Sequence, residues 1–257
     1  MVIMGSLKSE IRDMALKAGF AAAGFTSPEA VDDLKYGWVY DVREVKKPSE
    51  ILPEANSVIM LAFHMWDPAF MLQIDSPEWK GYRFHGPGDK AEGYYISYQV
   101  SMVKALPILT RFLELGHKAQ FTTAIPMKST AVRAGLGRQG KNTLLVTPEV
   151  GPRVGLMGIL TSAKLEPDQP FTGDFCEGCD KCVKACPTGA LSPYKIDPMR
   201  CLAYASENPG RTDFIPEIRE KERKLAKRPT PRSYVECSAC MYACPVGKRA
   251  RSVQLSP

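Results

Sequence analysis

The first apolar pattern along the chain predicts a helix over residues 7–18. Its apolar positions recur three or four residues apart, as on one face of a helix: Leu7, Ile11, Met14, Ala15 and Ala18. Ser6 has the side chain of a helix N-cap, and Gly19 is the expected stop. We therefore expect an amphipathic helix whose inner face packs on a core.

Residues 57–63 form an almost continuous apolar run with turn residues on both sides. A short run of this kind is typical of a strand that is buried on both faces. Shorter apolar stretches predict further strands at 20–25, 118–123, 143–147 and 153–162. The last two are expected to be joined directly by residues 148–152.

Residues 95–115 carry the longest helical pattern. Six apolar residues recur there at helical spacing, and Gly116 ends the pattern: Ile96, Val100, Val103, Leu106, Phe112 and Leu113. Pro107 has no amide hydrogen and should kink this helix. A shorter helix is expected at 129–134.

The alternation of strands and helices indicates an α/β layer fold for the first part of the chain. We predict two domains, an α/β cofactor and substrate domain at 1–165 and a second domain at 166–257. The irregular stretch 66–92 is rich in proline, glycine and charge. Stretches of this length inside a compact domain usually serve a function.

Composition agrees with a folded, water-soluble chain. Hydrophobic residues make up 44% of the 257 residues, which is enough for a core. The net charge of +6 permits an anionic partner without requiring one. No apolar run approaches the ~18 residues of a membrane span. The first residues lack a basic export leader and a twin arginine, so we expect a reduced, cytoplasmic protein.

The eight cysteines all lie in the last third of the chain, in two groups. The first group reads Cys176-x-x-Cys179-x-x-Cys182-x-x-x-Cys186-Pro187, which is the bacterial ferredoxin spacing for 4Fe-4S clusters. The second consists of Cys201 and then Cys237-x-x-Cys240-x-x-x-Cys244-Pro245. Eight thiolates suffice for two clusters, so we predict a ferredoxin-like domain that transfers electrons.

Disulfide bonds and zinc are the alternatives for these cysteines. A reducing compartment and the C-x-x-C spacing argue against disulfides. Pairs of C-x-x-C do bind zinc, but the uninterrupted run that ends in Cys186-Pro187 is much less usual for it.

In such a run the first three thiolates bind one cluster and the fourth binds the other. One ligand set is therefore expected to be Cys176, Cys179, Cys182 and Cys244, and the other Cys186, Cys201, Cys237 and Cys240. An insertion separates Cys201 from Cys237. Its mixed basic and acidic run, 219–232, predicts a solvated helix face.

A glycine-rich segment, Gly135-Leu136-Gly137-Arg138-Gln139-Gly140-Lys141-Asn142-Thr143, resembles two nucleotide-binding motifs. Its context argues against both, because a helix precedes it, a strand follows it and Asn142 stands where a phosphate loop needs a hydroxyl. Two interpretations remain open. The glycines permit a tight turn with positive φ, or they let the backbone approach a large flat cofactor.

The same segment resembles the core motif of the epoxyqueuosine reductases. Those enzymes carry A-G-L-G-x-x-G-K-N-T before a cysteine run that ends in C-P-T-G-A, as residues 134–143 and 186–190 do here. Residues 52–59 and 200–204 are also similar to that family. The related reductive dehalogenases share 124–126 and 147–154. The resemblance covers most of residues 5–247 and is weak between 64 and 95.

This resemblance implies a nitroreductase-like α/β domain that binds a base-off cobalamin, followed by two 4Fe-4S clusters that supply it with electrons. It implies a cytoplasmic oxidoreductase that takes electrons from a reduced ferredoxin or flavodoxin-type donor and, through the corrinoid, reduces a small or nucleoside-like substrate. The motif residues expected to bind the cofactor are Ala134, Gly135, Leu136, Gly137, Gly140, Lys141, Asn142 and Thr143.

Two departures from the family argue against tRNA as the substrate. Epoxyqueuosine reductases have an aspartate as presumed proton donor before the glycine motif, and no carboxylate occurs here between Gly116 and Gly140. The sequence also ends at Pro257, without the helical repeats that many of those enzymes carry.

Reductive dehalogenases instead use a tyrosine with a basic residue. Tyr95 and Tyr98 at the start of the long helix, with Lys128 and Lys141, are therefore the catalytic candidates.

Two other functions remain open from the sequence. The chain could be a ferredoxin-type electron carrier, or a reductive activator of a corrinoid protein, without substrate chemistry of its own. A flavin or nucleotide reductase is the third hypothesis.

Overall fold

The structure is a computed structural model. It describes residues 6–34, 45–65, 67, 69–70, 73–74, 82–85, 94–95, 97–208, 210–225 and 234–247. Within this part of the chain, no helix is long and apolar enough to cross a membrane.

The main sheet has four strands in the order β1-β2-β9-β6, and every neighbouring pair is antiparallel. The strands are β1 (Ala22–Thr26), β2 (Ser57–His64), β9 (Val154–Thr161) and β6 (Ala119–Thr122). β2 is buried along its whole length, as the continuous apolar run predicted. Its neighbours cover both edges, with Ile59 opposite Phe25 on one side and Ile159 on the other.

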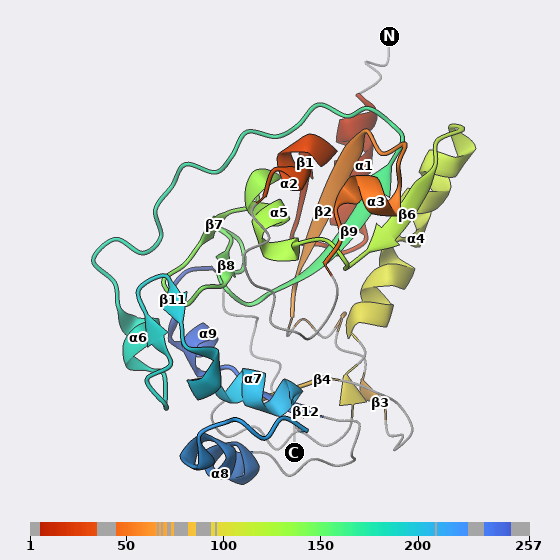
Figure 1. The fold of residues 1–257 in the computed structure, drawn as a ribbon. Helices are drawn as coiled ribbons and strands as arrows, with labels where there is room; N and C mark the ends of the chain where they lie inside the picture. The colour runs from red at the N-terminus through yellow and green to blue at the C-terminus, as the bar shows by residue number, and fades with distance from the viewer. Residues whose placement is uncertain are drawn as a thin grey trace.

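Helices cover both faces of this sheet (Figure 1). On one face, α1 (Leu7–Lys17) and α4 (Ser97–Glu114) pack on alternate strand residues such as Ile59, Leu61 and Phe63. On the other, α2 (Pro28–Asp32), α3 (Pro48–Ile51) and α5 (Met127–Arg133) pack on the intervening ones, such as Met60 and Ala62. The predicted α/β layer fold is thus confirmed as a mixed α/β arrangement of three layers.

The first helix agrees closely with its prediction. Ser6 caps α1 by accepting a hydrogen bond from the Ser9 amide at 3.3 Å. Ile11 and Ala15 are fully buried. Gly19 follows the helix with φ of 97°, a conformation that glycine adopts without strain.

The helix predicted over 95–115 is present as α4, but its apolar positions do not all face the core. Val103, Leu106 and Leu113 are 70%, 53% and 60% exposed. The buried stripe runs instead through Ser101, Ala105, Ile108 and Phe112, at intervals of four, three and four residues. Because both stripes have helical spacing, hydrophobicity alone did not identify the inward one. Pro107 lies inside α4, as expected.

The glycine-rich segment folds into a small hairpin, β7 (Arg138–Gln139) with β8 (Leu145–Val146). The strand predicted over 143–147 is present but short, since only Leu145–Val146 is extended in β8, and the one predicted over 153–162 is β9. Thr143 has φ of 63°, which interrupts an extended strand, and an antiparallel bridge between Thr147 and Gly151 closes the following turn.

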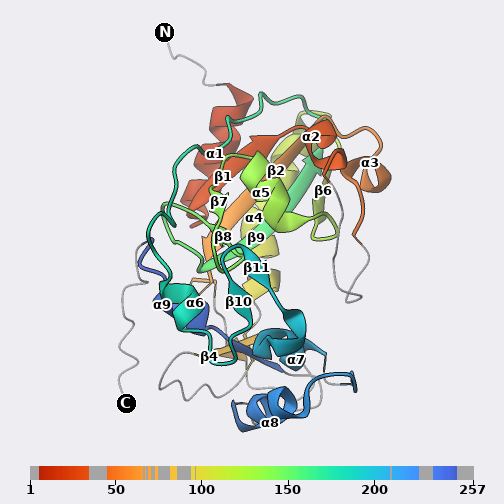
Figure 2. The ribbon, with the colours of Figure 1, turned by 60° about the vertical axis from the view of Figure 1, so that its left-hand side comes forward.

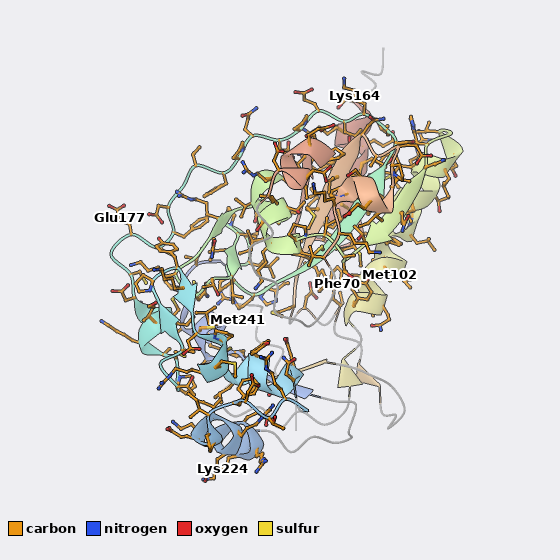
Figure 3. The ribbon with its side chains drawn as sticks, viewed as in Figure 1. Phe70, Met102, Lys164, Glu177, Lys224 and Met241 are labelled. Carbon is orange, nitrogen blue, oxygen red and sulfur yellow. The ribbon has the colours of Figure 1, made fainter. Side chains whose placement is uncertain are left out.

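A long linker without helix or strand joins β9 to α6 (Lys181–Lys184) and follows the outer edge of the α/β layers. Figure 3 labels Lys164 near its start and Glu177 near its end. Asp168 fixes its middle, because the Asp168 amide donates to the Phe25 carbonyl at 2.8 Å.

The C-terminal part consists of short elements, seen from a second side in Figure 2. After α6 come the hairpin β10 (Leu191–Ser192)–β11 (Lys195–Ile196), the 3-10 turn η1 (Pro198–Arg200), α7 (Leu202–Glu207), α8 (Pro216–Leu225), β12 (Tyr234–Cys237) and α9 (Ala239–Ala243).

A second four-stranded sheet connects this part to the first half of the chain. Its order is β12-β4-β5-β3, with β4 (Tyr82–His85), β5 (Tyr94–Tyr95) and β3 (Gln73–Ile74). β12 runs parallel to β4 and places Cys237 opposite His85. Strand pairing therefore crosses the domain boundary predicted at residue 165.

The prediction of a solvated face for the basic run is wrong for Arg219. Its guanidinium donates to the carbonyls of Ala205 and Arg211, the first at 2.6 Å, and to that of Asn208. It also pairs with the buried Glu222 and lies over the Phe214 ring. Arg219 thus binds the carbonyl end of α7, where cations are favoured. Glu220, Arg223 and Lys224 of the same run are exposed, as predicted, and residues 226–232 lie outside the described residues.

Candidate functional site

Four cysteines line one hollow at the junction of the two parts of the chain. They are Cys176, Cys179, Cys182 and Cys244, and the rest of the lining includes Lys141, Asn142 and Val146 from the glycine-rich hairpin. These are the four thiols expected from the sequence to share a cluster.

The thiols that raise one another's pKa fall into the same two groups as the expected ligand sets. Burial raises the pKa of Cys182, and the nearby Cys176 and Cys244 raise it further. The pKa of Cys244 is also raised by burial first, and then by Cys176 and Cys179. These thiols therefore lie close enough to repel one another's negative charge.

The other four cysteines form a second group. Burial raises the pKa of Cys240 to about 12, and Cys237, Cys201 and Cys186 contribute to the increase. The pKa of Cys201 is raised by burial and by Cys237 and Cys186. The charge of Cys182, in the first group, also raises the pKa of Cys240. The two groups are therefore neighbours, and the helices α6 and α9 that carry these two cysteines are in contact.

Cys186 differs from its neighbours because its thiolate receives hydrogen bonds. Burial would raise its pKa, but hydrogen bonds from Thr188, Ala190 and Leu191 outweigh burial and lower it. The Ala190 amide donates to Cys186 Sγ at 3.3 Å. Amide donors of this kind stabilise thiolates and the sulfur atoms of bound clusters.

The described residues contain no group of three or more His, Cys, Asp or Glu side chains arranged around a single metal ion. In a cubane each thiolate binds a different iron atom, so its ligands surround a space rather than a point. A hollow lined by four cysteines is the arrangement that such a cluster requires.

The glycines of the hairpin are needed for contacts within the chain itself. Gly135 has φ of 75°, and a Cβ there would stand 2.5 Å from the Gln169 carbonyl oxygen of the linker. A Cβ on Gly137 would stand 2.0 Å from the Val146 carbonyl oxygen. The faces that lack a side chain thus contact this chain's own backbone, which supports the tight-turn interpretation.

Two further residues of the motif belong to the core. Ala134 and Leu136 are 1% and 6% exposed and pack with α5 and β2. Ala134 also approaches Gly24 so closely that a Cβ on Gly24 would stand 2.2 Å from the Ala134 oxygen. Their contact with a cofactor stays a prediction.

Three residues of the motif instead lie beside the first cysteine group. A Cβ on Gly140 would stand 3.6 Å from Cys176 Sγ, and Lys141 and Asn142 line the hollow. Asn142 is 3% exposed and accepts a hydrogen bond from the Leu144 amide. Thr143 follows with the strained φ described above.

Lys141 is paired at the rim of this hollow. Its Nζ lies 2.8 Å from Asp180 Oδ1. The hydrogen bond to Asp180 raises the pKa of Lys141, while burial opposes the increase. Its ammonium group therefore stays charged at neutral pH, next to the cysteines.

Tyr98 and Lys128 are not among the residues that line the hollow. Tyr98 lies in the first turn of α4, is half-buried and packs against the core, and Lys128 is exposed on α5. Tyr95 lies in β5, opposite Gln73 and Tyr82, and its side chain lies outside the described residues. The catalytic roles of these residues stay predictions.

Sequence reasoning missed Arg153. This residue precedes β9 and is 3% exposed, and its guanidinium donates to the Cys244 carbonyl at 3.1 Å. The signal was available, because an arginine between Pro152 and the apolar strand is a charge that must be buried with partners.

Comparisons with known proteins agree with this arrangement. Residues 175–247, which contain all eight cysteines, match the family model described as "4Fe-4S double cluster binding domain". The chain is 32% identical to epoxyqueuosine reductase of Listeria monocytogenes over 95% of its length and 65% of the relative. It is 29% identical to that of Bacillus subtilis over 94% of its length and 64% of the relative. The chain thus spans just under two thirds of these relatives.

Solved structures show the same fold. A crystal structure of epoxyqueuosine reductase with a tRNA-Tyr epoxyqueuosine-modified stem loop matches with a TM-score of 0.64 at 26% identity, covering 93% of this chain and 64% of that one. A catabolic reductive dehalogenase matches in fold, with a TM-score of 0.55 at 18% identity, covering 93% of this chain and 31% of the other. The resemblance predicted from the motifs is therefore confirmed: over nearly all of its length this chain is a relative of the epoxyqueuosine reductases, and its cysteine-rich part is of the double 4Fe-4S cluster type.

Proposed function

We propose that the chain is an iron–sulfur oxidoreductase whose two 4Fe-4S clusters pass electrons to a corrinoid that reduces a nucleoside-like or other small substrate. The observation that carries this proposal is the hollow lined by Cys176, Cys179, Cys182 and Cys244 against the glycine-rich hairpin. A cluster held by these four thiols would be in contact with the α/β part of the chain. An independent electron carrier would not need this contact.

The two ligand sets of the proposal follow the two electrostatic groups. Cluster I is held by Cys176, Cys179, Cys182 and Cys244, and cluster II by Cys186, Cys201, Cys237 and Cys240. Cys182, a ligand of cluster I, raises the pKa of Cys240, a ligand of cluster II, which supports a short distance between the clusters. In this proposal cluster I is the one next to the α/β part, because its hollow is lined by the glycine-rich hairpin, and a ferredoxin or flavodoxin-type donor supplies the electrons to the pair.

Gly140, Lys141 and Asn142 have a specific role in this proposal. They contact cluster I rather than a corrinoid, because they lie at the cysteine hollow. The Lys141 ammonium and the buried Asn142 then provide charge and polarity beside the cluster, two of the properties that set cluster potentials.

The corrinoid rests on the family resemblance. When bound, cobalamin supplies a low-valent cobalt centre for the reduction. The backbones of Gln169 and Val146 lie against Gly135 and Gly137 where a side chain would stand. These two glycines therefore provide no surface for a corrinoid. In the proposal the corrinoid lies against other residues of the α/β part.

The substrate belongs to the proposal as well. One solved epoxyqueuosine reductase is in complex with an epoxyqueuosine-modified tRNA stem loop. The stretch 117–139 of this chain has no carboxylate for proton donation. We therefore propose a tyrosine, Tyr98 or Tyr95, as donor, and a substrate that need not be tRNA.

The experiment is an absorption spectrum of the anaerobically reconstituted protein with added cobalamin and a reduced ferredoxin. We expect a shift to the base-off form, retention of the corrinoid after desalting and its reduction by the donor. The Cys176→Ser variant is the matched control, and it should bind the corrinoid without transferring electrons to it. Absence of a spectral shift in a protein with both clusters would contradict the corrinoid.

A further inference from the structure

Two stacked phenylalanines lie at the end of the linker, against the first cysteine group. Phe175 directly precedes Cys176 and is one of the residues that line the hollow. The Phe171 ring stacks on the Phe175 ring, with the ring centroids 4.8 Å apart and the planes 14° from parallel. Glu177, labelled in Figure 3, shows where along the linker these rings lie. The linker therefore places an aromatic pair beside the cysteines that follow it.

The turn between the two rings is held by close contacts. A Cβ on Gly173 would stand 2.5 Å from Cε1 of the Phe171 ring, so glycine lets the backbone lie against this ring. The Gly173 carbonyl accepts a hydrogen bond from Arg138 of the glycine-rich hairpin at 3.4 Å. The Asp174 carboxylate accepts one from the Cys176 amide at 2.8 Å. The aromatic pair is thus fixed to the hairpin on one side and to a cluster ligand on the other.

The pair lies at the border between the hollow and the solvent. Phe175 lines the hollow together with the apolar Val146 and Pro245, and both rings of the pair are half-buried. An aromatic ring in this position keeps water away from the iron and sulfur atoms behind it. The apolar shell around a metal site controls solvent access, and solvent exposure is one of the properties that set cluster potentials.

We propose that the Phe171–Phe175 pair is a solvent shield for cluster I. Phe175 excludes water from the cluster, and Phe171 is a positioning residue that acts through Phe175. One-electron reduction adds negative charge to the cluster, and water stabilises that charge better than an aromatic ring does. The shield therefore lowers the potential of cluster I and makes it a stronger reductant for the group that it supplies. This inference rests on the two clusters of the proposed function.

The test uses the anaerobically reconstituted full chain and its variants. Phe175→Ala removes the ring at the hollow, Phe175→Leu keeps apolar bulk there, and Phe171→Ala removes only the supporting ring. Phe121→Ala is the matched control, since Phe121 is a half-buried phenylalanine of β6 that packs on the α/β core. No variant changes a charge, so the charged groups at the hollow, such as Lys141 and Lys181, are the same in all of them.

Two measurements report on cluster I in these proteins. A redox titration followed by electron paramagnetic resonance gives its potential. The deuterium modulation of the same signal in heavy water reports the water near the cluster. The Cys186→Ser variant, which should retain cluster I alone, identifies the signal. The deuterium measurement responds to water access, and a loss of overall stability does not by itself change it.

We expect Phe175→Ala to shift the potential of cluster I to more positive values and to increase its deuterium modulation, with cluster II unchanged. Phe171→Ala should change both quantities in the same direction by less. Phe175→Leu and Phe121→Ala should stay close to the parent protein. Unchanged values for cluster I in Phe175→Ala, a changed potential without added deuterium modulation, or equal changes at both clusters would overturn the inference.

Phe171→Ala decides the case in which Phe175→Ala does not assemble cluster I. This variant leaves the lining of the hollow intact, and increased deuterium modulation of its cluster I supports the shield, whereas values equal to those of the parent overturn it. A parent protein that assembles both clusters and binds no corrinoid would refute the proposed function and leave this measurement unaffected. The two failures are therefore distinguishable.

Discussion

The Nη2 atom of Arg12 lies 2.8 Å from Oδ1 and 2.7 Å from Oδ2 of Asp168. Arg12 is on α1 and Asp168 is in the linker, so this contact fixes the connection between the two parts of the chain. Lys8 Nζ and the Phe25 amide also bind this carboxylate, at 2.7 and 3.0 Å. The Asp168 side chain thus holds helix α1 and strand β1 against the linker.

Replacement of Asp168 by Asn should destabilise the protein by about 1–3 kcal/mol, because two cations lose their partner and the Phe25 amide keeps only a neutral acceptor. Urea unfolding measures the change. Glu166→Gln removes the same charge from an exposed position of the same linker and should have little effect. Equal effects of the two variants would contradict this role for Asp168.

Gly135 is expected to be intolerant of a side chain for two separable reasons. Alanine at φ of 75° costs about 1 kcal/mol, and its Cβ would also stand 2.5 Å from the Gln169 oxygen. Gly116 has φ of 79° with nothing within 4 Å of its Cβ position, so Gly116→Ala isolates the conformational cost.

We expect Gly135→Ala to lower the free energy of unfolding by clearly more than Gly116→Ala. Equal losses in thermal or urea unfolding would show that the linker does not need the close approach at Gly135.

The cysteines should differ in reactivity before iron is bound. With a pKa of about 12, only ~10⁻⁴ of Cys240 is thiolate at pH 8, whereas hydrogen bonds lower the pKa of Cys186. We expect iodoacetamide to modify Cys240 much more slowly than Cys186 in the iron-free protein. The rate at Cys240 should rise about tenfold per pH unit below its pKa.

The same values predict a pH dependence of cluster assembly. A raised pKa favours the neutral thiol, and iron binding must then release that proton, so assembly of cluster II should become more favourable as pH rises. Peptide mass spectrometry and iron content at several pH values measure both effects. Alkylation of Cys240 at pH 7 as fast as that of Cys186 would contradict the burial of this thiol.

Local patterns predicted those features that depend on local chemistry. The spacing of the cysteines identified the 4Fe-4S type, and the division of thiols in the structure follows the same order. The apolar run at 57–63 predicted β2, and the cap at Ser6 predicted the start of α1. In each case the residues that carry the prediction also make the contacts.

Features that depend on distant contacts could not be predicted in this way. The glycines of 135–140 suggested a cofactor surface, but Gly135 is required by the linker thirty-four residues later in the sequence. The outward stripe of Val103 and Leu106 is as apolar as the inward one. The pairing of β12 with β4 joins segments about 150 residues apart, and no local pattern specifies such a pair.

The most direct test of the central claim is an iron and acid-labile sulfide count, with electron paramagnetic resonance, on anaerobically reconstituted Cys186→Ser and Cys244→Ser. If the ligand sets are correct, each variant loses about half of its iron. Cys186→Ser should keep the cluster of Cys176, Cys179 and Cys182, and Cys244→Ser should keep the other. Loss of the Cys176 cluster alone in Cys186→Ser would contradict the assignment.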